Sequence, residues 1–406
     1  MAKRILPALA DLSQDIAGTI PVDLILRWAT GQRSREMHRK LLKPYTIYGT
    51  AVSSDSAGLS RLSLEKTLLE VLQLVSQPKE IIFAYGKKIG GRAIGMWIAD
   101  NTEMFYGSGI SPQSVLEQML SAQQEINHLS VKVGLGIHTG EYIDIGGGLF
   151  GDEADFIEDV AENYTEGGEV VVSLPLKEKL HLSHASALSL RADLRFKIPV
   201  YRVNYEHLNI SGVKDSDTRY PHPFDQNFFD YLTRSPLADP AVVAEIKKNY
   251  SVQTNVLLFK IRHRRRKLLL DQLTDWVIAN SLINKQLQNE NITKIKSNGS
   301  LGIFICNEIK NLIEFAMSLK AKLEDTDFSA TFGMSGGEVF LFPISKSIKE
   351  IAGSPVNIAS KLAEDVGKKN AIYMDDSINI PPNYLPKCVP FSVPASHVQL
   401  QGNMLI

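Results

Sequence analysis

One segment of the chain combines side chains suited to holding a polar, negatively charged ligand. The stretch GSPVNIASKLAEDVGKKNAIYMDDS, residues 353–377, places a cation, Lys361, four residues after an amide, Asn357. A glycine, a pair of lysines and a short apolar run come next. An amide both donates and accepts hydrogen bonds, whereas an ammonium group only donates. These two residues either bind a ligand or are solvated on a helix, and the rest of the chain must decide which.

Three landmarks of the sequence occur twice, in the same order. The segments GLGIHTGEYIDI (134–145) and TFGMSGGEVFLFPI (331–344) share a glycine, three further residues and then Gly-Glu. Two more pairs lie at nearly the same offset: KKIGGRAIGMW (87–97) with KIKSNGSLGIF (294–304), and GDEADFIEDVAE (151–162) with GSPVNIASKLAE (353–364). A fixed offset across several landmarks predicts a duplicated domain.

Each copy is predicted to be an α+β (α/β sandwich) domain of the ferredoxin-like, split-βαβ kind. Runs of β-like residues alternate with amphipathic helices, yet some strands meet in hairpins at glycine turns. We expect a helical extension over residues 1–45, a first domain over 46–205, a connector over 206–250 and a second domain over 251–406. Because the connector is rich in proline and aromatic residues, we expect it to be packed.

Composition excludes several classes of partner. The formal net charge is −1 and the pI is near 6.8, so no overall field attracts nucleic acid or an anionic bilayer. Two cysteines indicate a reducing compartment without a disulfide framework. No apolar run approaches the ~18 residues of a membrane span. We therefore expect a cytoplasmic protein.

The duplicated motifs resemble the class III nucleotidyl (adenylate/guanylate) cyclase catalytic domain. The resemblance rests on SSDSAGLSRLS, KKIGGRA and GLGIHTGEY in the first copy, and on TKIKSNGS, GMSGGEV and GSPVNIASKLA in the second. It implies two tandem degenerate copies packed as an intramolecular pseudo-dimer with two crevices. In that family, two Asp of one domain hold divalent ions. The facing domain supplies a purine-reading pair, an Asn for the ribose and an Arg for the phosphate.

The resemblance assigns the metal positions of one crevice to the first copy. Asp55 matches the first metal-binding Asp. The second Asp is replaced by Arg92, or by Gly91 if the alignment slips by one residue. One carboxylate beside a guanidinium carries too little negative charge for two divalent ions, so Mg or Mn is expected only if a nucleotide brings it. Arg92 is expected to pair with phosphate oxygens in place of metal.

The nucleotide-reading positions of the same crevice fall in the second copy. Lys296 matches the purine-reading Lys, and Glu350 matches its acidic partner, which together suit adenine. Asn357 matches the ribose Asn, whereas Lys361 replaces the Arg. Lysine keeps the charge but lacks the planar fork that grips phosphate with two hydrogen bonds.

The opposite crevice is predicted not to bind nucleotide. Its six positions fall on Ile261 and Ser300 for metal, Lys88 and Gly148 for the purine, and Asp155 and Asp159 for ribose and phosphate. Two acids facing a triphosphate repel it by about 1 kcal/mol per close pair in water.

Two functions of different classes are compatible with these residues, and a third stays open. The leading hypothesis is a non-catalytic regulatory or scaffold protein of signal transduction, a pseudoenzyme that senses ATP. The alternative is a weak adenylate cyclase that converts ATP to cyclic AMP and pyrophosphate. The third is an interaction platform without any ligand, in which Arg92 bonds Asp55.

Each assigned residue also has an explanation that needs no ligand. Asp55 could cap the helix that comes after its strand. Lys296 and Glu350 could form a mere surface ion pair, and Asn357 could cap a helix that enters at Ile358.

Two further segments have competing interpretations. Residues 21–42 are predicted to form one helix with Leu24, Ile25, Trp28, Met37, Leu41 and Leu42 as apolar contacts. It either packs on its own domain or docks a protein partner. The basic run RHRRRK, residues 262–267, is predicted to be a solvated turn, with binding of phosphate or a polyanion as the alternative.

Overall fold

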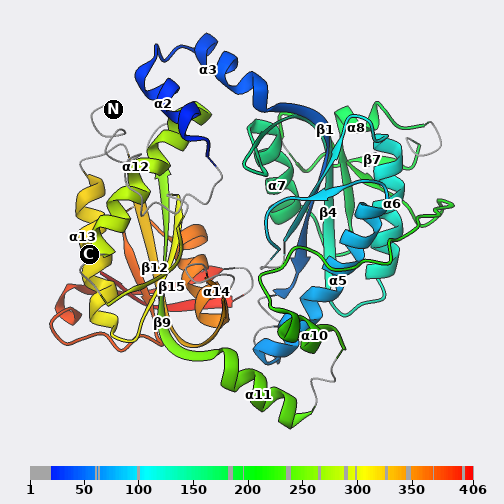
Figure 1. Cartoon of the computed structure of the whole chain (residues 1–406). Helices are drawn as coiled ribbons and strands as arrows, with labels where there is room; N and C mark the ends of the chain where they lie inside the picture. The colour runs from blue at the N-terminus through cyan, green and yellow to red at the C-terminus, as the bar shows by residue number, and fades with distance from the viewer. Residues whose placement is uncertain are drawn as a thin grey trace. The chain divides into compact units, whose positions relative to one another are not determined.

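The chain divides into two compact units in a computed structural model (Figure 1). The first unit is Leu42–Leu237, and the second unit joins Met1–Leu41 to Ala238–Ile406. The structure describes residues 20–405 except 60–61, 63–64, 98–100, 182–185, 195, 235–238, 264–266, 288–290, 298–299, 325–327, 344–348, 369 and 396–397.

The first unit is built on one mixed sheet with the strand order β2-β3-β1-β4-β6-β8-β7, and β5 pairs with β4. Helix α7 (Asp152–Tyr164) covers one face, and α5 (Leu68–Lys88) with α6 (Pro112–Ile126) covers the other (Figure 1). The strands are β1 (Thr46–Ala57), β2 (Arg92–Ala93), β3 (Thr102–Gly107), β4 (Lys132–Ile145), β5 (Gly148–Phe150), β6 (Val170–Ser173), β7 (Leu188–Leu190) and β8 (Val200–Val203).

The second unit repeats this topology strand for strand. Its order is β10-β11-β9-β12-β14-β16-β15, and β13 pairs with β12. The helices α12 (Leu269–Leu287) and α13 (Ile309–Glu324) replace α5 and α6, and α14 (Ser354–Lys361) replaces α7. The strands are β9 (Ser251–His263), β10 (Thr293–Ser297), β11 (Leu301–Cys306), β12 (Phe328–Pro343), β13 (Lys349–Ala352), β14 (Ile372–Asp375), β15 (Cys388–Ala395) and β16 (Val398–Leu405). The predicted duplication and the α+β class are confirmed.

Local sequence explains where these elements begin and what they bury. Thr67 and Glu70 form a reciprocal capping box at the start of α5, which satisfies two backbone donors. The central strands are buried on both faces and therefore consist of apolar runs such as Val170–Val172 and Val256–Phe259. No helix among the described residues is both long and apolar enough to cross a membrane.

The N-terminal segment forms two helices, so the single helix predicted over residues 21–42 is wrong. α2 (Val22–Thr30) ends at Gly31, and α3 (Arg35–Leu42) begins four residues later. α2 packs on α12 of the second unit, where the Trp28 indole donates to Asp271 Oδ1 at 2.9 Å. This part of the extension is thus joined to the second copy of the repeat rather than to the copy that comes next in the sequence.

The chain between the two copies is shared by both units. Tyr220 is buried in the first unit, where its hydroxyl bonds Ser76 on α5 at 2.9 Å. α10 (Gln226–Arg234) packs on α5, whereas α11 (Pro240–Tyr250) contacts β9 and β12 of the second unit. The expected connector, residues 206–250, therefore crosses the boundary between the units at residue 237.

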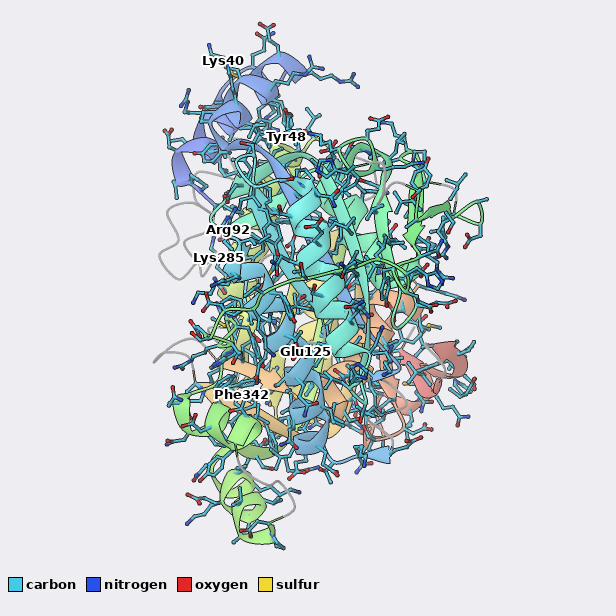
Figure 2. The ribbon with its side chains drawn as sticks, turned by 90° about the vertical axis from the view of Figure 1, so that its right-hand side faces the viewer. Lys40, Tyr48, Arg92, Glu125, Lys285 and Phe342 are labelled. Carbon is cyan, nitrogen blue, oxygen red and sulfur yellow. The ribbon has the colours of Figure 1, made fainter. Side chains whose placement is uncertain are left out.

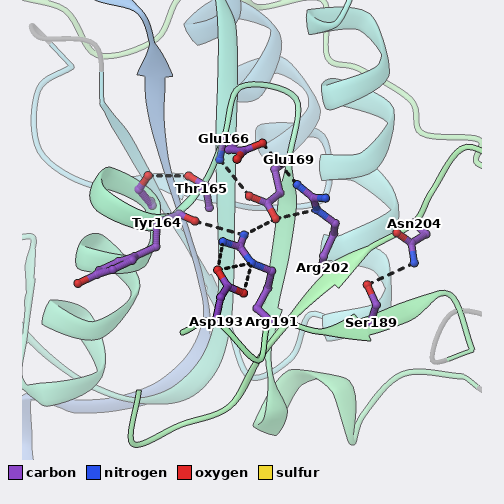
Figure 3. Close-up of polar contacts among 10 residues, drawn as sticks. Tyr164, Thr165, Glu166, Glu169, Ser189, Arg191, Asp193, Arg202 and Asn204 are labelled. Atoms are coloured by element: carbon purple, nitrogen blue, oxygen red, sulfur yellow. Dashed lines mark hydrogen bonds and ion pairs between the residues drawn. The ribbon is translucent and has the colours of Figure 1, made fainter. Parts of the chain in front are cut away.

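A buried ion-pair network closes the far edge of the first sheet (Figure 3). The carboxylate of Glu169 has only 1% of its side chain exposed and accepts from two guanidinium groups, Arg191 and Arg202. Arg191 also pairs with Asp193, whose side chain is 60% exposed. A carboxylate removed from water needs such partners, because its desolvation is otherwise uncompensated.

Replacing Glu169 by Ala should strongly destabilise the first unit, because two guanidinium groups lose their buried partner. We expect a loss of about 1.5–3 kcal/mol in the free energy of unfolding, the contribution of a hydrogen bond to a charged group. Urea unfolding of the full chain, monitored by circular dichroism, measures it as an earlier transition. Asp193→Asn is the matched control, since it removes an exposed partner of the same arginine. Equal midpoints for the two variants would contradict this assignment.

Candidate functional site

The strongest candidate binding group in the second unit is an ion pair between two strands that are not paired with each other, β10 and β13. Lys296 Nζ on β10 lies 3.1 Å from Glu350 Oε1 and 3.3 Å from Oε2 on β13. The Glu350 side chain is 5% exposed, whereas that of Lys296 is 44% exposed. Burial raises the pKa of Glu350, and the Lys296 ammonium opposes that rise. The pair is therefore half-buried and is not a mere surface pair. The Glu350 carboxylate is the buried acceptor, and the Lys296 ammonium is the donor that reaches solvent.

A β-bulge in β10 sets the direction of Lys296. Lys294 lies opposite Phe304 and Lys296 opposite Ile303, so one extra residue, Ile295, is accommodated between them. In a regular strand, residues two apart share a face. The bulge breaks this rule: Lys294 bonds Asn284 on α12, whereas Lys296 turns to the opposite face and meets Glu350.

Helix α14 carries the other two predicted ligand residues of the second unit. It begins at Ser354 after Gly353, whose φ of 155° favours glycine. Asn357 is exposed and lies inside the helix, so the expectation that it caps a helix entering at Ile358 is wrong. Lys361 stands one turn later as the last residue of α14. Residues four apart share one helix face, so their side chains leave the same side of α14.

Glycine at position 333 lets α14 lie directly on the sheet. A Cβ added to Gly333 on β12 would come within 2.1 Å of the Ala359 carbonyl oxygen. The helix therefore sits closer to β12 than any side chain would allow. This close approach fixes the height of Asn357 and Lys361 above the sheet.

In the first unit, Asp55 lies on β1 on the face covered by α7. It is partly exposed and stands opposite Gly134, two residues before the end of the strand. Ser53 stands opposite Gly136, whose added Cβ would meet Ile157 on α7. Residues two apart on a strand share a face, so Asp55 points to the α7 side as well.

Arg92 does not lie beside Asp55. It stands on the edge strand β2 opposite Phe105, which pairs with Ala51, four residues along β1 from Asp55. The Arg92 side chain is labelled in Figure 2. Its guanidinium bonds Asp144 Oδ2 at 2.5 Å and covers the Phe105 ring. The Arg92–Asp55 pair considered from the sequence is thus replaced by an Arg92–Asp144 pair. A role for Arg92 in binding phosphate stays a prediction.

The sheet registers also correct the alignment of the two copies at this hairpin. Lys88 is the last residue of helix α5, so it cannot match Lys296 on a strand. The matching place is Ile94, whose amide donates to the Glu103 carbonyl; Glu103 and Ile303 stand at the same level of their sheets. The second unit thus has a cation at the place predicted to read the purine, and the first unit has an apolar residue there.

The same registers also change which residue of the second copy matches Asp55. Gly136 and Gly333 are matching residues, and their partners are Ser53 and Leu258. Two residues further along lie Asp55 in the first unit and Lys260 in the second. Ile261, the residue matched to Asp55 from the sequence, faces the opposite side of its sheet, in the core beneath α12 and α13. A cation, not an isoleucine, therefore replaces Asp55.

Sequence reasoning missed one carboxylate that this alignment brings out. Ser300 precedes Gly302 by two residues, and Gly302 matches Thr102 by register. Counting two residues back from Thr102 gives Asp100, which lies outside the described residues. The signal was the segment ADNTEMFYG, in which an acid shortly precedes β3. Within the described residues, no group of three or more His, Cys, Asp or Glu could hold a metal ion.

The residues matched to the opposite nucleotide-reading set do not form a comparable group. Asp155 and Asp159 lie on α7, where Asp159 accepts from Asn163 at 2.9 Å. Gly148 opens the short strand β5 and offers no side chain. The first unit thus presents acids where the second presents an amide and an ammonium.

One solved structure is similar to this chain over most of its length. No protein-family model matches the sequence, and no curated protein matches it. A solved structure described as a class III adenylyl cyclase-like ATP-binding protein from Pseudomonas aeruginosa is similar over 93% of this chain and 91% of its own, with a TM-score of 0.53 and 12% identity. The chain has the class III nucleotidyl cyclase fold.

Shorter matches involve single cyclase domains. The adenylyl cyclase CyaB from P. aeruginosa covers 39% of this chain and 94% of its own, with a TM-score of 0.32 and 14% identity. The guanylyl cyclase domain of the RhoGC fusion protein from Blastocladiella emersonii covers 38% and 97%, with a TM-score of 0.33 and 13% identity. Both copies in this cyclase-fold chain have the strand order described above.

Replacing Glu350 by Gln should change how stability depends on pH. The pKa of Glu350 is raised above its ordinary value of 4.5 in the folded protein. Its contribution to stability is therefore fully present below that value and is lost as the pH rises through the raised pKa. We expect the free energy of unfolding of the wild type, minus that of Glu350→Gln, to fall as the pH rises above the ordinary value of 4.5. Urea unfolding at several pH values tests this, and a constant difference would contradict it.

Proposed function

We propose that this protein binds ATP and that its second unit recognises the adenine base. The observation that carries the proposal is the Lys296–Glu350 pair, in which a buried carboxylate and a solvent-reaching ammonium lie 3.1 Å apart. Asn357 and Lys361 are proposed to contact the ribose and the phosphates. The ATP-binding description of the similar P. aeruginosa structure supports this choice of ligand.

The pair distinguishes adenine from guanine by its pattern of donors and acceptors. An ammonium can donate to the unprotonated ring nitrogen of adenine, and a carboxylate can accept from the exocyclic amine. Guanine presents a ring N–H and a carbonyl oxygen at these places, which sets donor against donor and acceptor against acceptor. Buried groups left without a partner cost about 1–3 kcal/mol each, so discrimination should be large.

Replacing Lys296 by Met should weaken ATP binding at least tenfold, because a hydrogen bond to a charged group contributes about 1.5–3 kcal/mol. Isothermal titration calorimetry with ATP and GTP measures the effect, and we expect the wild type to prefer ATP. Lys294→Met is the matched control: it removes an equal charge two residues away that faces α12 and bonds Asn284. Equal losses in both variants, or a wild type that prefers GTP, would contradict the proposal.

We favour a regulatory or scaffold role in signalling over efficient catalysis. Lys361 stands where the resemblance calls for Arg, and an ammonium cannot hold a planar phosphate edge with two parallel hydrogen bonds. Binding needs only the charge, whereas charge that develops during reaction must be met by donors already in position. This difference favours an ATP-binding protein with slow or absent turnover.

Weak adenylate cyclase activity is the second candidate, and the position of Arg92 is the observation that favours it. The sequence alignment predicted too little negative charge for metal because it matched Arg92 to the second metal-binding Asp. The strand register instead puts Arg92 opposite Phe105. With Asp100 counted there, two carboxylates, Asp55 and Asp100, match the family's metal-binding pair. When bound with nucleotide, a divalent ion would screen the phosphates and lower the pKa of the attacking hydroxyl.

In the cyclase candidate Asp55 supports metal-dependent turnover, so Asp55→Asn should abolish the formation of cyclic AMP from Mn-ATP. In the wild type we expect Mn²⁺ to tighten ATP binding about tenfold, or about 1.4 kcal/mol. Asp144→Asn is the control, since this carboxylate pairs with Arg92 elsewhere on the same sheet. Chromatography of the same Mn-ATP incubations detects cyclic AMP and decides between the two candidates. A wild type indifferent to Mn²⁺ would exclude the cyclase.

A further inference from the structure

Two cations on β9 hold the end of the helix that carries Asn357 and Lys361. Lys260 Nζ lies 3.2 Å from Glu364 Oε2, and the other oxygen of Glu364 accepts from Ser360 Oγ at 2.8 Å. Arg262 donates to the backbone carbonyls of Ala363 and Glu364 and to the Thr331 hydroxyl. The first residue of the basic run 262–267 is therefore engaged with the protein's own backbone rather than solvated.

The backbone at this point needs such donors. α14 passes without interruption into one turn of π-helix, Leu362–Val366. The last carbonyls of a helix have no partner within it, and π-turns are wider and rarer than α-turns. Arg262 supplies donors to two of these carbonyls from the neighbouring strand. The turn after Lys361 is thus fixed by a side chain of the sheet below it.

Lys260 has a further significance because it occupies the place of Asp55. Asp55 lies two positions beyond Ser53, the partner of Gly136, on the face covered by α7. Lys260 lies two positions beyond Leu258, the partner of Gly333, on the face covered by α14. In the first unit this place holds a carboxylate that suits a cation. In the second unit it holds a cation that binds a carboxylate of the chain itself, Glu364. A position matched to metal binding has thus become an internal contact.

The charges around the π-turn show what this contact does for Lys361. Glu364 and Asp365 stand three and four residues after Lys361, within reach on a helix surface. Burial raises the pKa of Asp365, and the Lys361 ammonium opposes that rise, so the two groups interact. Lys260 and Arg262 offset the two acids. The Lys361 ammonium can then bind an anion such as a phosphate group.

We propose that Lys260 and Arg262 are positioning residues for phosphate binding: by holding Glu364 and the π-turn, they keep the Lys361 ammonium available to ATP. This inference rests on the proposed function and concerns the phosphate part of the same site. It gives the second unit a built-in cationic clamp in place of a metal position. Neither residue is proposed to touch the nucleotide.

Lys260→Met separates this role from a merely structural one when two ligands are compared. We expect about a fivefold loss of ATP affinity, because the unpaired Glu364 attracts Lys361, and unchanged affinity for adenosine, which has no phosphate. The double variant Lys260→Met/Glu364→Gln removes the unpaired acid and should restore ATP affinity to within about twofold. Calorimetry measures all three proteins. An equal loss for both ligands, or no rescue, would overturn the proposal.

Amide hydrogen exchange tests the clamp without nucleotide. In Arg262→Gln, the amides of residues 354–366 should exchange faster, while those of α12 and α13 keep wild-type rates. If the wild type binds neither ATP nor adenosine, the proposed function fails, and exchange alone still shows whether the clamp exists. Unchanged exchange over 354–366 would show that it does not.

Discussion

The second unit is organised around one buried carboxylate. Glu350 is almost completely removed from water, and a charge in that situation needs a partner and hydrogen bonds to remain ionised. The partner, Lys296, comes from another strand and reaches it only because a bulge turns one residue to the other face. An apolar pair would hold these strands together at lower cost. The persistence of charge at this place is therefore the main reason to look for a ligand there.

The two units have the same strand order but carry different polar side chains at matching places. Matching places hold Ile94 and Lys296, Asp55 and Lys260, Gly148 and Glu350, and Asp155 and Asn357. In each pair the two units hold side chains that differ in charge or polarity. Strand order is preserved because it depends on apolar residues buried on both faces, which tolerate exchange of one aliphatic side chain for another. Positions at strand ends and on helix faces, such as Asp55 and Asn357, carry no such constraint, so their side chains can differ between the units.

The fold could be predicted from the sequence to this level because glycines and apolar runs recur at one offset. In the second unit Lys296 and Glu350 form an ion pair, and their role as nucleotide ligands stays a prediction. What failed was the hairpin of the first unit. Ile94 and Glu103 are paired there nine positions apart (103 − 94), whereas Lys296 and Ile303 are paired seven apart (303 − 296), so a gapless match moved Arg92 into the wrong place. Neither a bulge nor the level at which strands pair is visible in a single sequence, because both depend on tertiary hydrogen bonds. Asp100 was missed for the same reason, since the match was anchored on Lys88, which ends a helix.

The residue that distinguishes ATP sensing from catalysis is therefore Lys361 rather than the carboxylates. If Arg92 does not occupy the metal corner, shortage of negative charge no longer argues against a reaction. The remaining departure is Lys361, and its surroundings matter as much as its type. Glu364 and Asp365 lie within one turn of it. Lys260 pairs with the Glu364 carboxylate, and Arg262 bonds the backbone carbonyls of the same turn, which in our proposal leaves the ammonium available to a phosphate. An arginine at position 361 could serve an acid and a phosphate at once through its several donors, whereas an ammonium shared in this way holds each less firmly. A lysine in this position thus suits a site that recognises a triphosphate and retains it, which is the requirement of a sensor.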